Sequence, residues 1–262
     1  MAIIVIVSSS TFWLLQNRNS NPTPGQHQAK PSATSLTSIP TWTVTAFKPS
    51  PLAIFFDMFA GNFHGWSLGN NDGYFRFMVN DSLILSTMNP NSTLVESFPT
   101  ITNLDNYVVS IDFMINQADA RDSMGLYLRG DSTLDHDYRI DINGNNTLDI
   151  AKEYLDTRQS GQTELLVPPA PSAYLKPLGH ANTLTVFMIG PTIIAEINNI
   201  VVMTTTDSEY TNGQIALFAR HHSSPRGIVV SFTRAEIDRL ASPFMRPTPT
   251  PTLTPTASPG QP

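Results

Sequence analysis

The sequence predicts an all-β domain, a two-sheet antiparallel jelly-roll sandwich, over residues 53–241. The first observation is an alternation of apolar and polar residues: YVVSIDFMI (107–115) places its odd-numbered residues on one face and Ser110 and Asp112 on the other. The second is that Gly, Pro, Asn or Asp bounds each such run. Helical periodicity is absent, apart from a weak candidate in AEIDRL (235–240). Many short strands with turns between them are typical of a sandwich.

The N-terminal segment, residues 1–16, is predicted to be a hydrophobic anchor or an export signal. Its sequence from residue 2, AIIVIVSSSTFWLL, is apolar apart from a Ser/Thr run. It is shorter than the roughly 20 residues of a spanning helix, so it fits the remaining half of a truncated transmembrane helix. It also lacks the Lys or Arg that precedes a signal-peptide core. A buried strand is the other interpretation.

Residues 17–52 and 242–262 are predicted to be disordered linkers. The first segment is rich in Asn, Ser, Thr, Pro and Gln without apolar periodicity, and it cannot bury enough apolar surface to order itself. The second, a Pro/Thr repeat, favours an extended stalk. Together they predict an extracellular or cell-surface location, membrane-anchored or secreted, with membrane contact through the N-terminal segment alone.

Composition excludes several function classes. Lys and Arg number only 15 and the formal net charge is −6, which argues against a nucleic-acid partner. The chain has no Cys, so disulfides, thiolate catalysis and Cys-ligated metals are excluded. Neither a G-x-S-x-G elbow nor a phosphate-binding G-x-x-x-x-G-K-[ST] loop occurs. We therefore expect no cofactor.

One hairpin can be placed in register from the sequence. In DYRIDINGNNTLDI, a two-residue loop would mix apolar and polar residues on each face. A three-residue loop at 144–146 instead pairs Ile142 with Leu148, and sets Asp141 opposite Asp149. Such a loop needs a residue at positive φ, which Gly or Asn supplies. The apolar pattern therefore selects the three-residue loop.

Four segments carry a family resemblance. They are FFDMFAGNFHGWSLGNNDGYFRFMVNDSLIL, GLYLRGDSTLDHDYRIDINGNNTLDI, HANTLTVFMIGPTIIAEINNIVV and DSEYTNGQIALFARHHSSPRGIVVSFTRAEI. In this order and spacing they resemble concanavalin A-like lectin/glucanase sandwiches, and more narrowly the bacterial 3-keto-disaccharide hydrolase-type group, a domain of unknown function for much of its history. The resemblance implies a jelly roll from about residue 53 to 240. We expect Phe59 and Trp66 of the first segment to fill the core.

Charged residues gather on the non-core faces of the predicted strands. Asp141, Asp149 and Glu153 share one hairpin face, and Arg139 and Arg129 have the parity to join them, together with Tyr127. Directly opposed aspartates repel, so the arginines must compensate. Three interpretations fit: a salt-linked polar surface, a ligand-binding face, or a catalytic carboxylate pair. Asp112 and Glu196 fall on the non-core faces of other strands.

Metal sites are not expected, with one weak exception. The loop DSTLDHD contains Asp131, Asp135 and Asp137. Laminin-like sandwiches hold calcium at a sheet rim, so the resemblance makes these three side chains candidate calcium ligands.

These observations predict a tethered, non-catalytic β-sandwich that binds carbohydrate, such as a polysaccharide or cell-surface glycan, or another surface ligand. The first alternative is a glycoside hydrolase or lyase of the keto-disaccharide type. The second is a sensor or spacer ectodomain with a protein partner. Because fold does not determine function, the ligand class rests on the resemblance.

Overall fold

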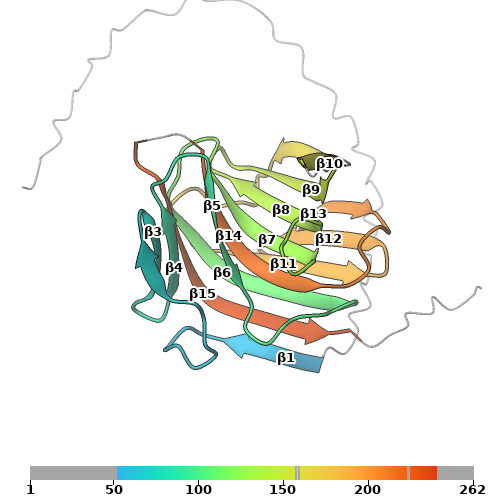
Figure 1. The fold of residues 1–262 in the computed structure, drawn as a ribbon, viewed down its shortest axis with the longest axis horizontal. Coiled ribbons are helices and arrows are strands. Elements are labelled where there is room, and N and C mark those ends of the chain that lie inside the picture. The colour runs from blue at the N-terminus through green and yellow to red at the C-terminus, as the bar shows by residue number, and fades with distance from the viewer. Residues whose placement is uncertain (1–51, 157, 159, 223–224, 241–262) are drawn as a thin grey trace, which may run out of the picture. The chain divides into compact units, whose positions relative to one another are not determined.

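The computed structural model describes residues 52–156, 158, 160–222 and 225–240. Within these ranges the chain forms two sheets and contains no helix (Figure 1). Neighbouring strands are antiparallel throughout both sheets. The predicted all-β, two-sheet antiparallel sandwich is therefore confirmed.

Nine strands form the larger sheet: β1 (Leu52–Asp57), β2 (Gly69–Asn71), β3 (Tyr74–Met78), β4 (Leu83–Thr87), β6 (Tyr107–Gln117), β11 (Asn182–Ile189), β12 (Thr192–Ile197), β13 (Ile200–Thr206) and β15 (Ile228–Arg239). Their order is β13-β12-β11-β6-β15-β4-β3-β2. Strand β4 pairs with the first half of β15, and β1 pairs with its second half. Strands far apart in sequence thus become neighbours around β6 and β15.

Six strands form the smaller sheet: β5 (Ser92–Ser97), β7 (Ser123–Gly130), β8 (Asp137–Asn143), β9 (Thr147–Leu155), β10 (Gly161–Pro171) and β14 (Gln214–His221). Their order is β10-β9-β8-β7-β14-β5, so the four strands from β7 to β10 form a meander at one side. Strand β14 joins this meander to β5.

The hydrophobic core lies between the two sheets, where the inward-facing side chains of both belong to one cluster. In β6 the burial alternates along the strand as the sequence predicts: Val109 and Ile111 are fully buried, whereas Ser110 and Asp112 on the outer face are partly exposed. Strands β7 and β8 contribute Leu126 and others from the opposite side. Burial of these apolar faces is the main favourable term that holds the sheets together.

The β8–β9 hairpin has the register that the sequence predicts. Ile142 pairs with Leu148, and Asp141 pairs with Asp149. The loop therefore has three residues, and Asn146, its last residue, adopts a φ of 63°. Its backbone N–H donates to the carbonyl of Asn143 at 2.9 Å. A one-residue slip would have moved the apolar side chains to the outer face, which explains why the pattern fixes the register.

The motif after β1 has a structural role. Asp57 is buried, and its carboxylate accepts one hydrogen bond from the backbone N–H of Phe59 and one from the indole N–H of Trp66, both at 2.7 Å. Phe59, at a φ of 54°, and Trp66 are almost fully buried in the core. Both aromatic residues therefore fill the core, as expected.

The structure contradicts one further prediction and does not describe the terminal segments. Residues 235–240, the weak helical candidate, are strand up to Arg239, because pairing with β1 and β6 overrides the local pattern. The predictions for 1–16, 17–51 and 242–262 lie outside the described residues. The part of the chain that is described contains no helix long and apolar enough to cross a membrane.

Candidate functional site

Five of the six predicted site residues lie together on the outer face of the smaller sheet. Cross-strand pairing sets Tyr127 of β7 beside Arg139 of β8, and Asp141 of β8 beside Asp149 of β9. Glu153 of β9 lies on the same face, because it follows Asp149 by four residues along the strand. This juxtaposition was predictable from strand parity and the hairpin register.

Two arginines hold this face together. Arg139 forms ion pairs with Asp141 and with Glu153. Arg220 of β14, which sequence reasoning did not select, lies 3.7 Å from a carboxylate oxygen of each of the same two acids and donates to the hydroxyl of Tyr127 at 3.1 Å. Opposite charges therefore connect β8 and β9 with β14 across the intervening β7, and they compensate for the clustered carboxylates.

The opposed aspartates have additional partners. Asp141 accepts a hydrogen bond from the hydroxyl of Ser123 at 2.8 Å, and Asp149 accepts one from the amide of Asn143 at 2.9 Å. Burial, followed by the charge of Asp141, raises the pKa of Asp149. The side chains of Arg139 and Asp141 are only 6% and 4% exposed. The centre of the network is thus nearly closed to solvent.

Arg129 does not join this network, which corrects the prediction that it shares a face with Arg139. The register between β7 and β14 shifts at this point, and Arg129 has a φ of 52°. Its guanidinium donates instead to the backbone carbonyls of Asp105, Gly190 and Tyr210 at 2.6–3.1 Å. Because of this irregularity in the strand, the side chain of Arg129 connects three loops through hydrogen bonds and does not join the predicted ligand-binding face.

The three calcium candidates do not converge. Asp131 accepts hydrogen bonds from Thr133 and Asp135 within its own loop and lies 3.1 Å from a ring nitrogen of His136. Asp137 is fully buried, and burial raises its pKa to about 8. Among the described residues, no group of three His, Asp or Glu side chains could hold a metal ion.

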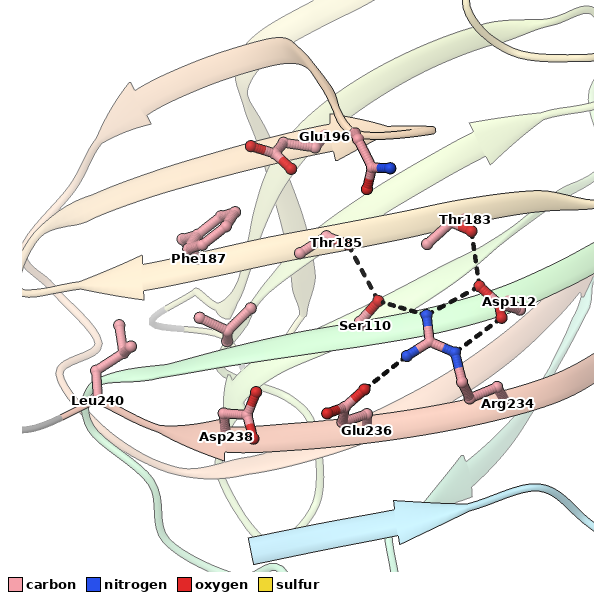
Figure 2. Close-up of a pocket in the computed structure, with 12 residues that line it drawn as sticks. Ser110, Asp112, Thr183, Thr185, Phe187, Glu196, Arg234, Glu236, Asp238 and Leu240 are labelled. Atoms are coloured by element: carbon pink, nitrogen blue, oxygen red, sulfur yellow. Dashed lines mark hydrogen bonds and ion pairs between the residues drawn. The ribbon is translucent and has the colours of Figure 1, made fainter. Parts of the chain in front are cut away.

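A groove of about 330 Å³ lies on the outer face of the larger sheet (Figure 2). Its floor is a row of side chains from four neighbouring strands: Glu196 of β12 pairs with Thr185 of β11, Thr185 with Ser110 of β6, and Ser110 with Glu236 of β15. The hydroxyls of Ser110 and Thr185 lie 3.1 Å apart. Because the two central side chains are small, the row is hollowed between larger neighbours.

One wall of the groove is an ion-pair cluster around Arg234 (Figure 2). The guanidinium binds both carboxylate oxygens of Asp112, at 2.8 and 3.1 Å, and one oxygen of Glu236 at 2.6 Å. Thr183 donates to Asp112 at 2.6 Å. Burial acts to raise the pKa of Asp112, but the hydrogen bonds from Arg234 and Thr183 outweigh it and lower the pKa. This wall is therefore charged, and the bidentate pair of Arg234 and Asp112 fixes its geometry.

The opposite wall is largely apolar. Phe187 of β11 pairs with Val108 of β6, and Val108 pairs with Asp238 of β15. Leu240 extends this wall beyond the end of β15. The groove thus has the ring of Phe187 on one side and the ion-pair cluster around Arg234 on the other, with the hydroxyls of the floor between them (Figure 2).

No protein-family model and no curated protein sequence matches the chain. Solved structures do. The carbohydrate-binding module CBM66 from Bacillus subtilis aligns with a TM-score of 0.51 at 11% identity, covering 66% of this chain and 95% of that one. A Bacillus subtilis protein of unknown function with a galectin-like fold aligns with a TM-score of 0.54 at 12% identity, covering 73% of this chain and 97% of that one. The kappa-carrageenase of Pseudoalteromonas carrageenovora aligns with a TM-score of 0.53 at 9% identity, covering 78% of this chain and 100% of that one.

The chain has a galectin-like, concanavalin A-like jelly-roll fold. The fold that the resemblance implies is thereby confirmed, while the narrower keto-disaccharide hydrolase type stays a prediction. In this jelly roll the outer faces of the two sheets differ in access. Arg234 and Asp112 are 25% and 30% exposed, several times more than Arg139 and Asp141. The groove is therefore the more accessible of the two polar faces.

Only part of the groove can be predicted from the sequence. Strand parity assigns Ser110, Asp112 and Glu196 to non-core faces, but it cannot say that these faces are one and the same. Arg234 lies just after the register shift in β15, so simple alternation from Phe232 does not predict its position. The alternation of small hydroxyl residues with larger ones along YVVSIDFMI and NTLTVFMIG is the signal that points to the hollow.

Proposed function

We propose that the protein is a tethered extracellular module that binds a glycan without cleaving it, and that the groove on the larger sheet is the binding site. The observation that carries the proposal is the groove itself, which sets hydroxyls and an arginine–carboxylate cluster opposite Phe187. The segments 1–16, 17–52 and 242–262 support the tether and the location through their composition.

The chemistry of the groove suits a sugar. Sugar hydroxyls both donate and accept hydrogen bonds, and the groove offers both kinds of group in fixed positions. The apolar faces of sugar rings suit an aromatic wall such as Phe187. The volume of about 330 Å³ lies within the range of ligand pockets, near its lower end. Because Arg234 already holds Asp112 and Glu236, little side-chain entropy is lost on binding.

A glycan array with the full chain tests the proposal, using the variant S110W and the control T204W. Tryptophan at position 110 fills the groove floor without entering the core, so we expect affinity to fall by about tenfold or more. Thr204 is exposed on the same outer face, where it pairs with Ile194 outside the groove. T204W should therefore bind as the wild type does. Thermal unfolding of all three proteins checks that they fold alike.

The outcomes separate the two polar faces. If the wild type binds no glycan, the proposed function is wrong. If S110W binds as tightly as the wild type, the ligand belongs elsewhere, and the predicted face with Tyr127, Arg139 and Glu153 becomes the leading site. Arg220, whose side chain is 19% exposed against 6% for Arg139, would then be the residue to replace.

Hydrolysis is the second candidate, favoured by one observation. Asp149 has a raised pKa beside an opposed carboxylate, and glycosidases use such a pair as acid and base or nucleophile. Release of reducing sugars from a bound glycan by the wild type, abolished in D149N, would favour this candidate. Binding without product release supports the non-catalytic module.

A further inference from the structure

The floor of the groove does not end at Glu236. In the register of the larger sheet, Glu236 of β15 pairs with Phe56 of β1. Directly opposed residues of an antiparallel pair point to the same face, so Phe56 lies on the outer face next to the groove. The row that begins at Glu196 therefore continues across five strands. Neighbouring strands lie about 4.8 Å apart, which makes the row about 19 Å long.

Phe56 differs from its neighbours in β1. Phe55 and Asp57 are buried, but the ring of Phe56 is 50% exposed. A single exposed aromatic residue needs no explanation by itself. Its alignment with a groove of hydrogen-bonding groups is the informative feature, because an open ring face is what a sugar unit stacks on.

The junction between the groove and Phe56 is held in place. The carboxylate of Glu236 accepts from Arg234 at 2.6 Å, and Arg234 in turn binds Asp112 through two nitrogens. Figure 2 shows the guanidinium of Arg234 lying between these two carboxylates, with the strand β1 running beside β15. The groove and the strand that carries Phe56 are thus parts of one hydrogen-bonded sheet.

We propose that the groove binds a linear oligosaccharide that crosses the strands, and that Phe56 stacks on a sugar unit beyond Glu236. The inference rests on the proposed function and deepens it by naming the ligand class: a chain longer than the groove, not a single sugar. Phe56 is then a length-specificity residue, since short ligands fill the groove without reaching it.

The test uses the full chain and four ladders of probes, the cello-, laminari-, xylo- and chito-oligosaccharides from disaccharide to hexasaccharide, by isothermal titration. For a ladder that binds, we expect wild-type affinity to rise with length. F56A should lower the affinity for the hexasaccharide by about tenfold, as loss of one stacking contact implies, and leave the disaccharide unchanged.

F77A is the matched control. Phe77 of β3 is 41% exposed and pairs with Ile84 on the same outer face, but it lies outside the row. It should bind every probe as the wild type does, and both variants should unfold at similar temperatures. A length-dependent loss in F56A alone cannot come from general destabilisation.

The titrations distinguish failure of this inference from failure of the proposed function. If the wild type binds a ladder but its affinity is the same for all lengths, or F56A binds the hexasaccharide normally, the inference is wrong while the proposed function stands. If the wild type binds no member of any ladder, the proposed function is overturned for these glycans, and the inference falls with it.

Discussion

Asp137, the first residue of β8, carries an unusual carboxyl group. It is fully buried, and among the described residues neither of its oxygens has a hydrogen-bond partner. Burial, only partly offset by the charge of Arg139, raises its pKa from 3.8 to about 8. The folded protein therefore keeps this carboxyl protonated at neutral pH, whereas the unfolded chain ionises it.

The sign of the effect follows from proton linkage. Between pH 3.8 and about 8 the folded state binds a proton that the unfolded state releases, so the free energy of unfolding falls as pH rises through this window. Each pH unit is worth about 1.4 kcal/mol. The free energy of unfolding is therefore lower at pH 7 than at pH 3.8 by about 4 kcal/mol.

The substitution D137N removes this ionisation while keeping the shape of the side chain. We expect it to stabilise the protein by about 4 kcal/mol at pH 7, and the advantage to vanish near pH 4. Urea unfolding followed by tryptophan fluorescence measures both values. D81N, which replaces an exposed carboxylate in the turn between β3 and β4, is the control and should show no such gap.

Two results would contradict this account of Asp137. If D137N is no more stable than the wild type at pH 7, the carboxyl is ionised and compensated in the folded protein. If the advantage of D137N persists unchanged at pH 4, the stabilisation does not come from the ionisation of Asp137. The burial of Asp137 would then not control its protonation.

Two further predictions concern the fold that supports the groove. D57A leaves the buried N–H groups of Phe59 and Trp66 without their acceptor, so we expect a loss of about 3 kcal/mol or more and a Tm lower by roughly 6–12 °C, measured by calorimetry; a Tm within experimental error of the wild type would contradict this role. G125A places a methyl group onto the backbone carbonyl of Ile140, so the β7–β8 pairing must open and soluble expression or Tm should fall sharply. G69A, where an added methyl meets nothing within 4 Å, is its control, and equal behaviour of the two variants would show that the sheet relaxes freely around position 125.

Side-chain patterns in the sequence are sufficient to predict the fold class and the local register. Alternation along YVVSIDFMI is enough to decide which side chains are buried, because a strand has a period of two and one face must meet the core. The same rule fixed the pairing of Ile142 with Leu148, since any slip would expose apolar residues. The polar face with Asp141 and Asp149 followed directly, because its residues lie on consecutive strands of one hairpin.

The groove and the position of Arg129 depend on how distant strands pair. Ser110, Thr185, Glu196 and Glu236 lie in one row because β6, β11, β12 and β15 are neighbours in the sheet. Strand order depends on long-range pairing, which side-chain alternation does not encode. Strand alternation does not predict the positions of Arg129 and Arg234 either, because a register shift changes the face on which the following side chain lies. Such a shift depends on the partner strand.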